Sequence, residues 1–154
     1  FFLSLASPKI LCLGIIKLSF AFALTYSYLC KIDIPHNFME KLIGTIVSAI
    51  EDKKGKNIVS LDLSGFDGAI CSAFVVCNAD STTQVAAIAD GIEEKVQQEL
   101  GEKVWRVEGQ QSAVWIAMDY VDVVVHIFQT ELREFYRLEE LWADAPLTRH
   151  EYEE

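Results

Sequence analysis

The sequence has few basic residues and no repeats or low-complexity tracts. Its 154 residues include 13 Lys and Arg against 23 Asp and Glu, which gives a net charge of −10. Proteins that bind DNA or RNA broadly neutralise phosphates with Lys and Arg, so this balance predicts little direct nucleic-acid binding. It favours a basic protein surface as the partner. The length and apolar content fit one globular domain with a substantial core.

The short motifs of common enzyme classes are also missing. No P-loop, GxSxG or GxGxxG sequence occurs. Nucleotidyl transfer needs a Gly-Ser turn followed closely by an Asp-x-Asp pair that binds magnesium. Neither part is present, because the segment LDLS supplies only Asp62 and the segment DYVD spaces its two acids for a turn. These absences argue against the corresponding enzyme classes.

The four cysteines form neither a disulfide pattern nor a zinc pattern. Cys71 and Cys77 fall in one strand-like run, where six steps of roughly 3.3 Å separate them by about 20 Å, beyond disulfide reach. No CxxC or Cys/His spacing suggests zinc. We therefore expect free thiols in a reducing compartment.

Residues 1–38 are hydrophobic and need separate treatment. Residues 10–29 are apolar enough for a membrane span or a secretory segment, but Lys17 interrupts them and no A-x-A cleavage site follows cleanly. The first methionine is Met39, immediately before an amphipathic segment. We interpret residues 1–38 as an N-terminal extension outside the working domain. A real membrane or targeting segment and an ordered appendage remain alternatives.

The rest of the chain alternates between helical and strand-like periodicity. Apolar residues recur at helical spacing over 40–54, 81–100 and 131–141, and Ser81 with Gln84 has the pattern of a capping box. Strands are predicted at 57–63, 70–77, 103–109, 113–118 and 122–128. The last helix is expected to pack through an apolar stripe that includes Leu132, Phe135 and Leu138, and the acidic residues 147–154 are expected to form a solvated tail. This order predicts an α/β (α+β layered) domain with a single mixed sheet of about five strands and helices packed on it.

Three polar residues interrupt the apolar run at 113–129, namely Asp119, Asp122 and His126. Asp122 and His126 share a strand face, but four strand steps separate them by about 13 Å, so one metal ion cannot bind both. Asp119 and Asp122 flank a two-residue turn and could face each other there. They could bind a cation, or they could be solvated turn acids, which is the better interpretation. The run therefore predicts no metal site.

Large amphipathic and acidic side chains gather on the same predicted strands. An isolated histidine or tryptophan in an apolar strand is usually structural. A group of aromatic residues with sparse charge is instead typical of the centre of a protein interface. The candidate residues for docking a partner are Glu108, Trp115, Tyr120, Asp122 and His126.

Four segments follow one another along the chain: VSAIEDKKGKNIVSLDLSG, TTQVAAIADGIEEKV, RVEGQQSAVWIAMDYVDVVVHIF and REFYRLEELWADAP. Taken in this order, they resemble the ribosomal silencing factor family, RsfS, also called the Iojap family. The resemblance runs over residues 39–146. It implies a mixed α/β sheet related to nucleotidyltransferases but without the catalytic motif.

The resemblance also implies a translation regulator that is not an enzyme and uses no cofactor. Members of the family bind the large ribosomal subunit through ribosomal protein L-fourteen and block joining of the small subunit, which represses translation when nutrients are scarce. Some members are dimers when isolated. Bacterial members are cytoplasmic, and eukaryotic relatives act in mitochondria or chloroplasts. The family's ribosome-facing residues correspond here to Trp115, Asp119, Tyr120, Asp122 and His126, with Glu108 as a weaker candidate.

The sequence departs from the family pattern at several positions. Val121 stands where members usually have glycine, a residue that readily adopts a positive φ in a turn. Val114 and Ser72 stand where acidic residues are common. Two functions from other classes also remain as alternatives, a metal-dependent nucleotidyltransferase-like enzyme that uses Asp119 and Asp122, and a membrane-tethered adaptor that depends on residues 10–29.

Overall fold

The computed structural model describes residues 36–150, and all structural statements below concern this range. The extension at 1–38 therefore lies outside the described residues, apart from its last three, which start the first described helix. In chain order the elements are α3 (His36–Asp52), β1 (Lys56–Asp62), β2 (Ala73–Ala79), α4 (Thr82–Leu100), β3 (Arg106–Glu108), β4 (Trp115–Asp119), β5 (Val123–Gln129), α5 (Thr130–Tyr136), α6 (Leu138–Leu141) and β6 (Leu147–His150).

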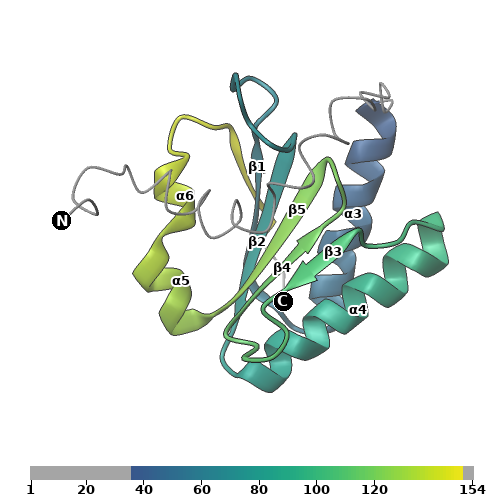
Figure 1. Ribbon diagram of the computed structural model, residues 1–154, viewed down its shortest axis with the longest axis vertical. Helices are drawn as coiled ribbons and strands as arrows, with labels where there is room; N and C mark the ends of the chain where they lie inside the picture. Colours follow the sequence, from purple (N-terminus) through teal and green to yellow (C-terminus); the bar gives the residue numbers. More distant parts are fainter. Residues whose placement is uncertain (1–35, 151–154) are drawn as a thin grey trace. The chain divides into compact units, whose positions relative to one another are not determined.

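The strands form one mixed sheet in the order β3-β4-β5-β2-β1-β6. The central pair, β2 and β5, is parallel, and the neighbouring pairs are antiparallel. Helices α3 and α4 cover one face, while α5 and α6 lie on the other side of the sheet (Figure 1). The predicted fold class, a layered α/β domain with a single mixed sheet, is confirmed.

Strand β5 shows how the sequence divides the two faces. Val123, Val125 and Ile127 are completely buried and belong to the hydrophobic core beneath α3 and α4. Because successive side chains of a strand point to opposite faces, Val124, His126 and Phe128 lie on the other face. Complete burial of each aliphatic side chain stabilises the fold by roughly 1.5–3 kcal/mol. The alternation therefore fixes which face of β5 enters the core.

The start of α4 confirms the predicted cap in part. Ser81 is in extended conformation, and its hydroxyl accepts a hydrogen bond from the Gln84 amide at 3.2 Å. The Gln84 side chain does not return to Ser81, as a capping box requires. It donates instead to the carbonyls of Lys53 and Lys54, at 3.2 and 3.0 Å. Gln84 thus ties the start of α4 to the end of α3.

The prediction of a solvated tail from residue 147 is wrong for residues 147–150. They form β6, which pairs antiparallel with β1 from Ile58↔His150 to Leu61↔Leu147. The Ser60 hydroxyl and His150 Nε2 lie 2.9 Å apart in this pairing. Without β6, one side of β1 would expose its unpaired backbone amides and carbonyls. The backbone pairing with β1 therefore orders residues 147–150 despite their polar composition. It gives the sheet six strands rather than five.

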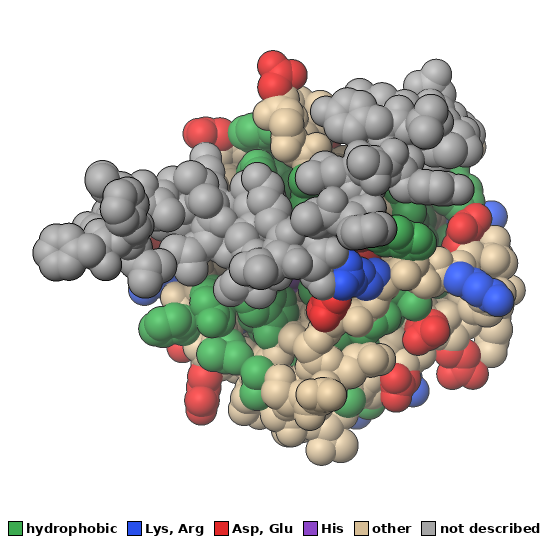
Figure 2. Space-filling view, in the orientation of Figure 1, with side chains coloured by type: hydrophobic (Ala, Val, Ile, Leu, Met, Phe, Trp, Pro, Cys, Tyr) green, Lys and Arg blue, Asp and Glu red, His purple; other side chains and the backbone are tan. Residues whose placement is uncertain are grey.

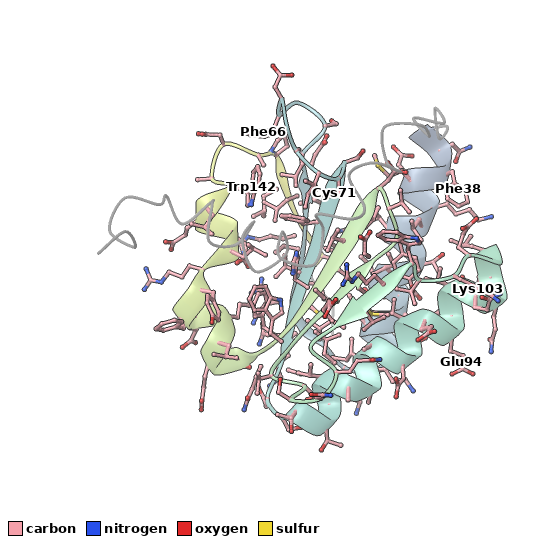
Figure 3. All side chains as sticks on the ribbon, viewed as in Figure 1. Phe38, Phe66, Cys71, Glu94, Lys103 and Trp142 are labelled. Atoms are coloured by element: carbon pink, nitrogen blue, oxygen red, sulfur yellow. The ribbon has the colours of Figure 1, made fainter. Side chains whose placement is uncertain are left out.

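The prediction of one continuous helix over 131–141 is also wrong. Arg137 adopts a left-handed conformation, with φ 46° and ψ 54°, and separates α5 from α6. The break changes which side chains reach the sheet, so Leu138 is buried while Phe135 is 77% exposed. After α6, Trp142 packs edge-on against Phe66, with ring centroids 5.7 Å apart (Figure 3). The expected stripe of the last helix therefore contributes Leu138 to the core but not Phe135.

Candidate functional site

The candidate site lies on the sheet face opposite α3 and α4. Directly paired residues of neighbouring strands point to the same face. The register pairs Trp115 with Phe128, Ala117 with His126 and Asp119 with Val124, and it places Glu108 opposite Ala117. Trp115, Asp119, His126 and Glu108 therefore share one surface, which we call the β3–β4–β5 face. Their role in docking a partner stays a prediction.

Trp115 is the half-buried centre of this face. Its ring stacks on Phe128 with centroids 4.9 Å apart and contacts Tyr136 at 5.2 Å. The indole Nε1 donates a hydrogen bond to His126 Nδ1 at 3.2 Å. An indole N–H can only donate, so His126 accepts through Nδ1 and carries its own proton on Nε2. The contact therefore requires a neutral imidazole.

His126 is completely buried, in contrast to the exposed contact residue that the sequence suggested. Phe74 lies edge-on to the imidazole, with centroids 4.9 Å apart. Burial disfavours the charged form and lowers the pKa of His126 to about 4. The histidine thus stays neutral at physiological pH and orients Trp115, which is the more accessible of the two.

The turn between β4 and β5 holds Asp119 and Asp122 in different roles. Asp119 is buried, and its Oδ1 accepts a hydrogen bond from the Val121 amide at 2.7 Å. Asp122 is half-buried, and its backbone carbonyl accepts from the Ser72 and Ala73 amides at the start of β2. Burial is the main cause that raises the pKa of both carboxyl groups. Asp119 therefore supports the turn, and Asp122 joins the turn to the central strand.

Val121 has φ 74°, in the positive-φ region that favours glycine. The Asp122 amide donates to the Tyr120 carbonyl at 3.0 Å across Val121. A hydrogen bond of this span with a positive central φ defines a γ-turn that is strained for residues with a Cβ. A β-branched side chain at this φ is a true conformational outlier. The departure noted in the sequence is thus a point of backbone strain.

The expectation that Tyr120 joins Trp115 and His126 is wrong. Tyr120 is 7% exposed and belongs to the core cluster beneath α3 and α4, on the opposite side of the sheet. Burial raises the pKa of its hydroxyl, and the charge of Glu93 on α4 adds to the increase. Alternation along β4 places Tyr120 on the core face with Ile116 and Met118, so the expectation failed because it followed residue type rather than strand alternation.

Glu108 and Gly109 form the outer margin of the face. Glu108 is exposed, and its Oε1 lies 2.6 Å from Nε of Arg106. Gly109 has φ 86°, and a Cβ placed on it would lie 2.0 Å from the carbonyl oxygen of Trp115. The glycine of the R-V-E-G segment is therefore required by a close backbone approach, which holds β3 against β4.

Two observations on residues 36–150 concern the alternative functions. There, no group of three or more His, Cys, Asp or Glu side chains is placed to hold a metal ion. No helix in the same range is long and apolar enough to cross a membrane. The apolar segment at 10–29, on which a membrane tether would depend, lies outside the described residues.

Sequence reasoning missed three residues that border the site. Tyr136 contacts Trp115 from α5, and Phe135 contacts Tyr136 with centroids 5.2 Å apart. Arg133 holds α5 in place through hydrogen bonds to the Asn57 carbonyl and to Asn78 Oδ1, at 2.6 and 2.8 Å. The adjacent aromatic residues Phe135 and Tyr136 could have indicated an exposed contact surface. Helical periodicity instead assigned Phe135 to the core.

Comparisons with known proteins agree with this geometry. The family model described as "Ribosomal silencing factor during starvation" matches residues 36–154. Ribosomal silencing factor RsfS of Halalkalibacterium halodurans is 41% identical over 107 residues, covering 70% of this chain and 90% of that protein. The RsfS protein of Bacillus subtilis is 37% identical over 108 residues, covering 70% of this chain and 90% of its own length.

Solved structures show the same fold. A crystal structure of a Chromobacterium violaceum protein superposes with a TM-score of 0.64 at 34% identity and covers 68% of this chain and 85% of its own. A crystal structure from Bacillus halodurans has a TM-score of 0.60 at 38% identity, with 71% of this chain and 97% of its own covered. Fold, sequence segments and family match lead to one conclusion: the chain belongs to the RsfS family of ribosomal silencing factors.

Proposed function

We propose that this ribosomal silencing factor binds the large ribosomal subunit through ribosomal protein L-fourteen. By occupying the surface that the small subunit needs, it prevents subunit joining and represses translation under nutrient limitation. The process makes and breaks no covalent bond and requires no cofactor. The functional unit is the folded domain, which the sequence placed at 39–146 and to which the start of α3 and strand β6 also belong. The hydrophobic extension before it takes no part in docking.

The observation that supports this proposal is that Trp115 on the β3–β4–β5 face is held rigidly and is still partly exposed. Its indole is fixed by Phe128, Tyr136 and the hydrogen bond to His126, and it remains partly accessible. Aromatic side chains held rigidly before binding are typical hot spots, because little conformational freedom is lost when the complex forms. Trp115 is therefore the proposed anchor.

The roles of the neighbouring residues follow from their burial. Glu108 is exposed and contributes charge at the margin, whereas Asp119 and His126 act by holding the turn and Trp115. The net charge of −10 favours association with a basic ribosomal protein over contact with ribosomal RNA. Aromatic and acidic residues on one face thus suit a protein partner.

The proposal includes the setting in which the protein acts. We place it in the cytoplasm, or in an organelle if the source is eukaryotic. The free protein is proposed to be capable of forming a homodimer. Sedimentation velocity of the 154-residue chain over a range of concentrations would measure this association directly.

Co-sedimentation with purified large subunits tests the function. The full chain should pellet with large subunits and should shift joined ribosomes toward free subunits. Trp115→Ala should weaken binding by about tenfold or more, the effect of losing an interface hot spot. Trp105→Ala is the matched control, because Trp105 is a 54% exposed tryptophan that lies outside the strands of the β3–β4–β5 face.

The outcomes are distinct. Circular dichroism must first show that both variants fold as the wild type does. A wild-type chain that does not bind large subunits would refute the function. Binding that is unchanged in Trp115→Ala would refute the proposed anchor, and equal weakening in Trp105→Ala would show that the effect is not specific to this face.

A further inference from the structure

Helix α5 exposes two adjacent aromatic side chains. Phe135 is 77% exposed and Tyr136 is 41% exposed, and no residue of α5 is buried. Single exposed apolar residues are common, but neighbouring ones that continue a defined surface often mark interaction sites. Figure 2 shows hydrophobic side chains at the outer surface of the molecule on the left, where α5 lies. α5 therefore presents apolar surface that the described fold does not use.

The two aromatic residues continue the β3–β4–β5 face. Tyr136 contacts Trp115 with ring centroids 5.2 Å apart, and Phe135 lies edge-on to Tyr136 at the same separation. We call Trp115, Tyr136 and Phe135 the aromatic row. It leads from the proposed anchor on β4 to the outer side of α5, so a partner seated on Trp115 would reach α5 without a gap.

A buried polar network fixes the far end of this row. The side chain of Arg133 is 12% exposed and forms an ion pair with Glu139 on α6. Its Nη1 donates to the Asn57 carbonyl and to Asn78 Oδ1. These bonds attach α5 to the ends of β1 and β2. The aromatic row is thus held in place before any partner arrives, which lowers the entropic cost of binding.

Acidic residues flank the two exposed aromatic residues along the chain. Residues 130–141 contain four Glu and two Arg, a net charge of −2. Arg133 pairs with Glu139 and Arg137 with Glu140, whereas Glu131 and Glu134 have no cationic partner within residues 36–150. Aromatic faces attract cations, and a nearby carboxylate strengthens that attraction through a charged hydrogen bond. An arginine or lysine side chain fits this environment, and a phosphate does not.

We propose that Phe135 and Tyr136 form a second part of the docking surface and receive an arginine or lysine side chain of the basic ribosomal protein. The cation lies against the ring of Phe135 and pairs with Glu131, which precedes Phe135 by four residues on the same face of α5, while Trp115 anchors the neighbouring part of the partner. This inference rests on the proposed function and adds to it the residues and the chemistry of one contact. Arg133 is a positioning residue in this arrangement.

Substitutions at Phe135 can separate cation binding from simple apolar contact. Because the side chain is 77% exposed, Phe135→Ala and Phe135→Leu are expected to fold normally. Both should weaken co-sedimentation of the full chain with large subunits by about fivefold to tenfold, because neither offers an aromatic face. Phe135→Trp should bind at least as well as the wild type. Glu131→Gln should also weaken binding and should reduce its dependence on salt.

Each result supports or overturns the proposal. If Trp115→Ala weakens binding but Phe135→Ala does not, the aromatic row is refuted while the proposed function stands. If the wild-type chain does not bind large subunits at all, the proposed function itself fails. Phe135→Leu binding like the wild type would refute the cation contact. Unchanged ribosome binding together with loss of self-association in Phe135→Ala would assign this surface to a second copy of the chain and overturn the proposal.

Discussion

Replacing Val121 with glycine should stabilise the protein. Val121 has φ 74° at the centre of the tight turn between β4 and β5. Its amide donates to Asp119 Oδ1 at 2.7 Å, and the Asp122 amide donates across it to the Tyr120 carbonyl. Neither hydrogen bond involves the valine side chain. Val121→Gly therefore keeps the turn and removes only the steric conflict.

The size of the effect follows from three contributions. A left-handed conformation costs an L-residue about 1–2 kcal/mol, which glycine does not incur. Glycine loses more conformational freedom on folding, which costs about 0.5–1 kcal/mol. Val121 is 54% exposed, so little apolar burial is lost. We expect a net stabilisation of roughly 0.5–1 kcal/mol, which corresponds to an increase in Tm of about 1–4 °C for a chain of this size.

Urea denaturation of the wild type, Val121→Gly and Val121→Ala measures this effect. Alanine keeps a Cβ and therefore keeps most of the strain, so Val121→Ala is the matched control and should not gain stability. A Val121→Gly protein that is less stable than the wild type, or no more stable than Val121→Ala, would show that the positive φ carries no strain. The three proteins should have the same m-value when the free energy of unfolding is extrapolated to zero urea, because the substitutions leave the surface buried on folding unchanged.

Three further predictions concern other positions. Because the folded pKa of His126 lies near 4, below its usual 6.5, the unfolded chain takes up a proton first as the pH falls. The free energy of unfolding should thus drop by about 2–3 kcal/mol between pH 7 and 4.5. Urea titrations of His126→Gln should show a smaller drop over the same range. An equal drop in this variant would contradict the lowered pKa of His126. Gly109→Ala would place a Cβ 2.0 Å from the carbonyl oxygen of Trp115. Thermal unfolding should show a loss of about 2 kcal/mol in stability, and large-subunit binding should be lost. A variant as stable as the wild type would contradict the close approach of the two backbones. Ser81→Ala should cost about 1 kcal/mol by the same measurement, and no change would show that the cap contributes nothing.

Much of the fold was predictable because local patterns and tertiary burial agree. The alternation of β5 places Val123, Val125 and Ile127 in the core and His126 on the opposite face, as the structure shows. The strand register then brings Trp115 and His126 together. Periodicity was sufficient here because both faces of β5 are buried by neighbouring elements.

The errors have different origins. Tyr120 continues the alternation of β4 onto the core face, so grouping it with Trp115 by residue type was the error. Arg137 breaks a helix whose apolar spacing looked continuous, which left Phe135 in solvent. Strand β6 has a polar sequence and forms because β1 offers an unpaired edge. The last two outcomes depend on a dihedral angle or a distant partner that no local pattern encodes.

The parallel pairing of β2 with β5 has a consequence for synthesis of the chain. β2 is buried along its whole length, yet its parallel neighbour begins 44 residues after it ends, at Val123. Until β5 has left the ribosome, Val75 and Val76 have neither a completed ladder nor a closed core. Non-local pairing of this kind requires loop closure before it provides stabilisation, so the domain should fold late in translation. A nascent chain interrupted before residue 129 would expose an apolar strand, and its fate would depend on chaperones.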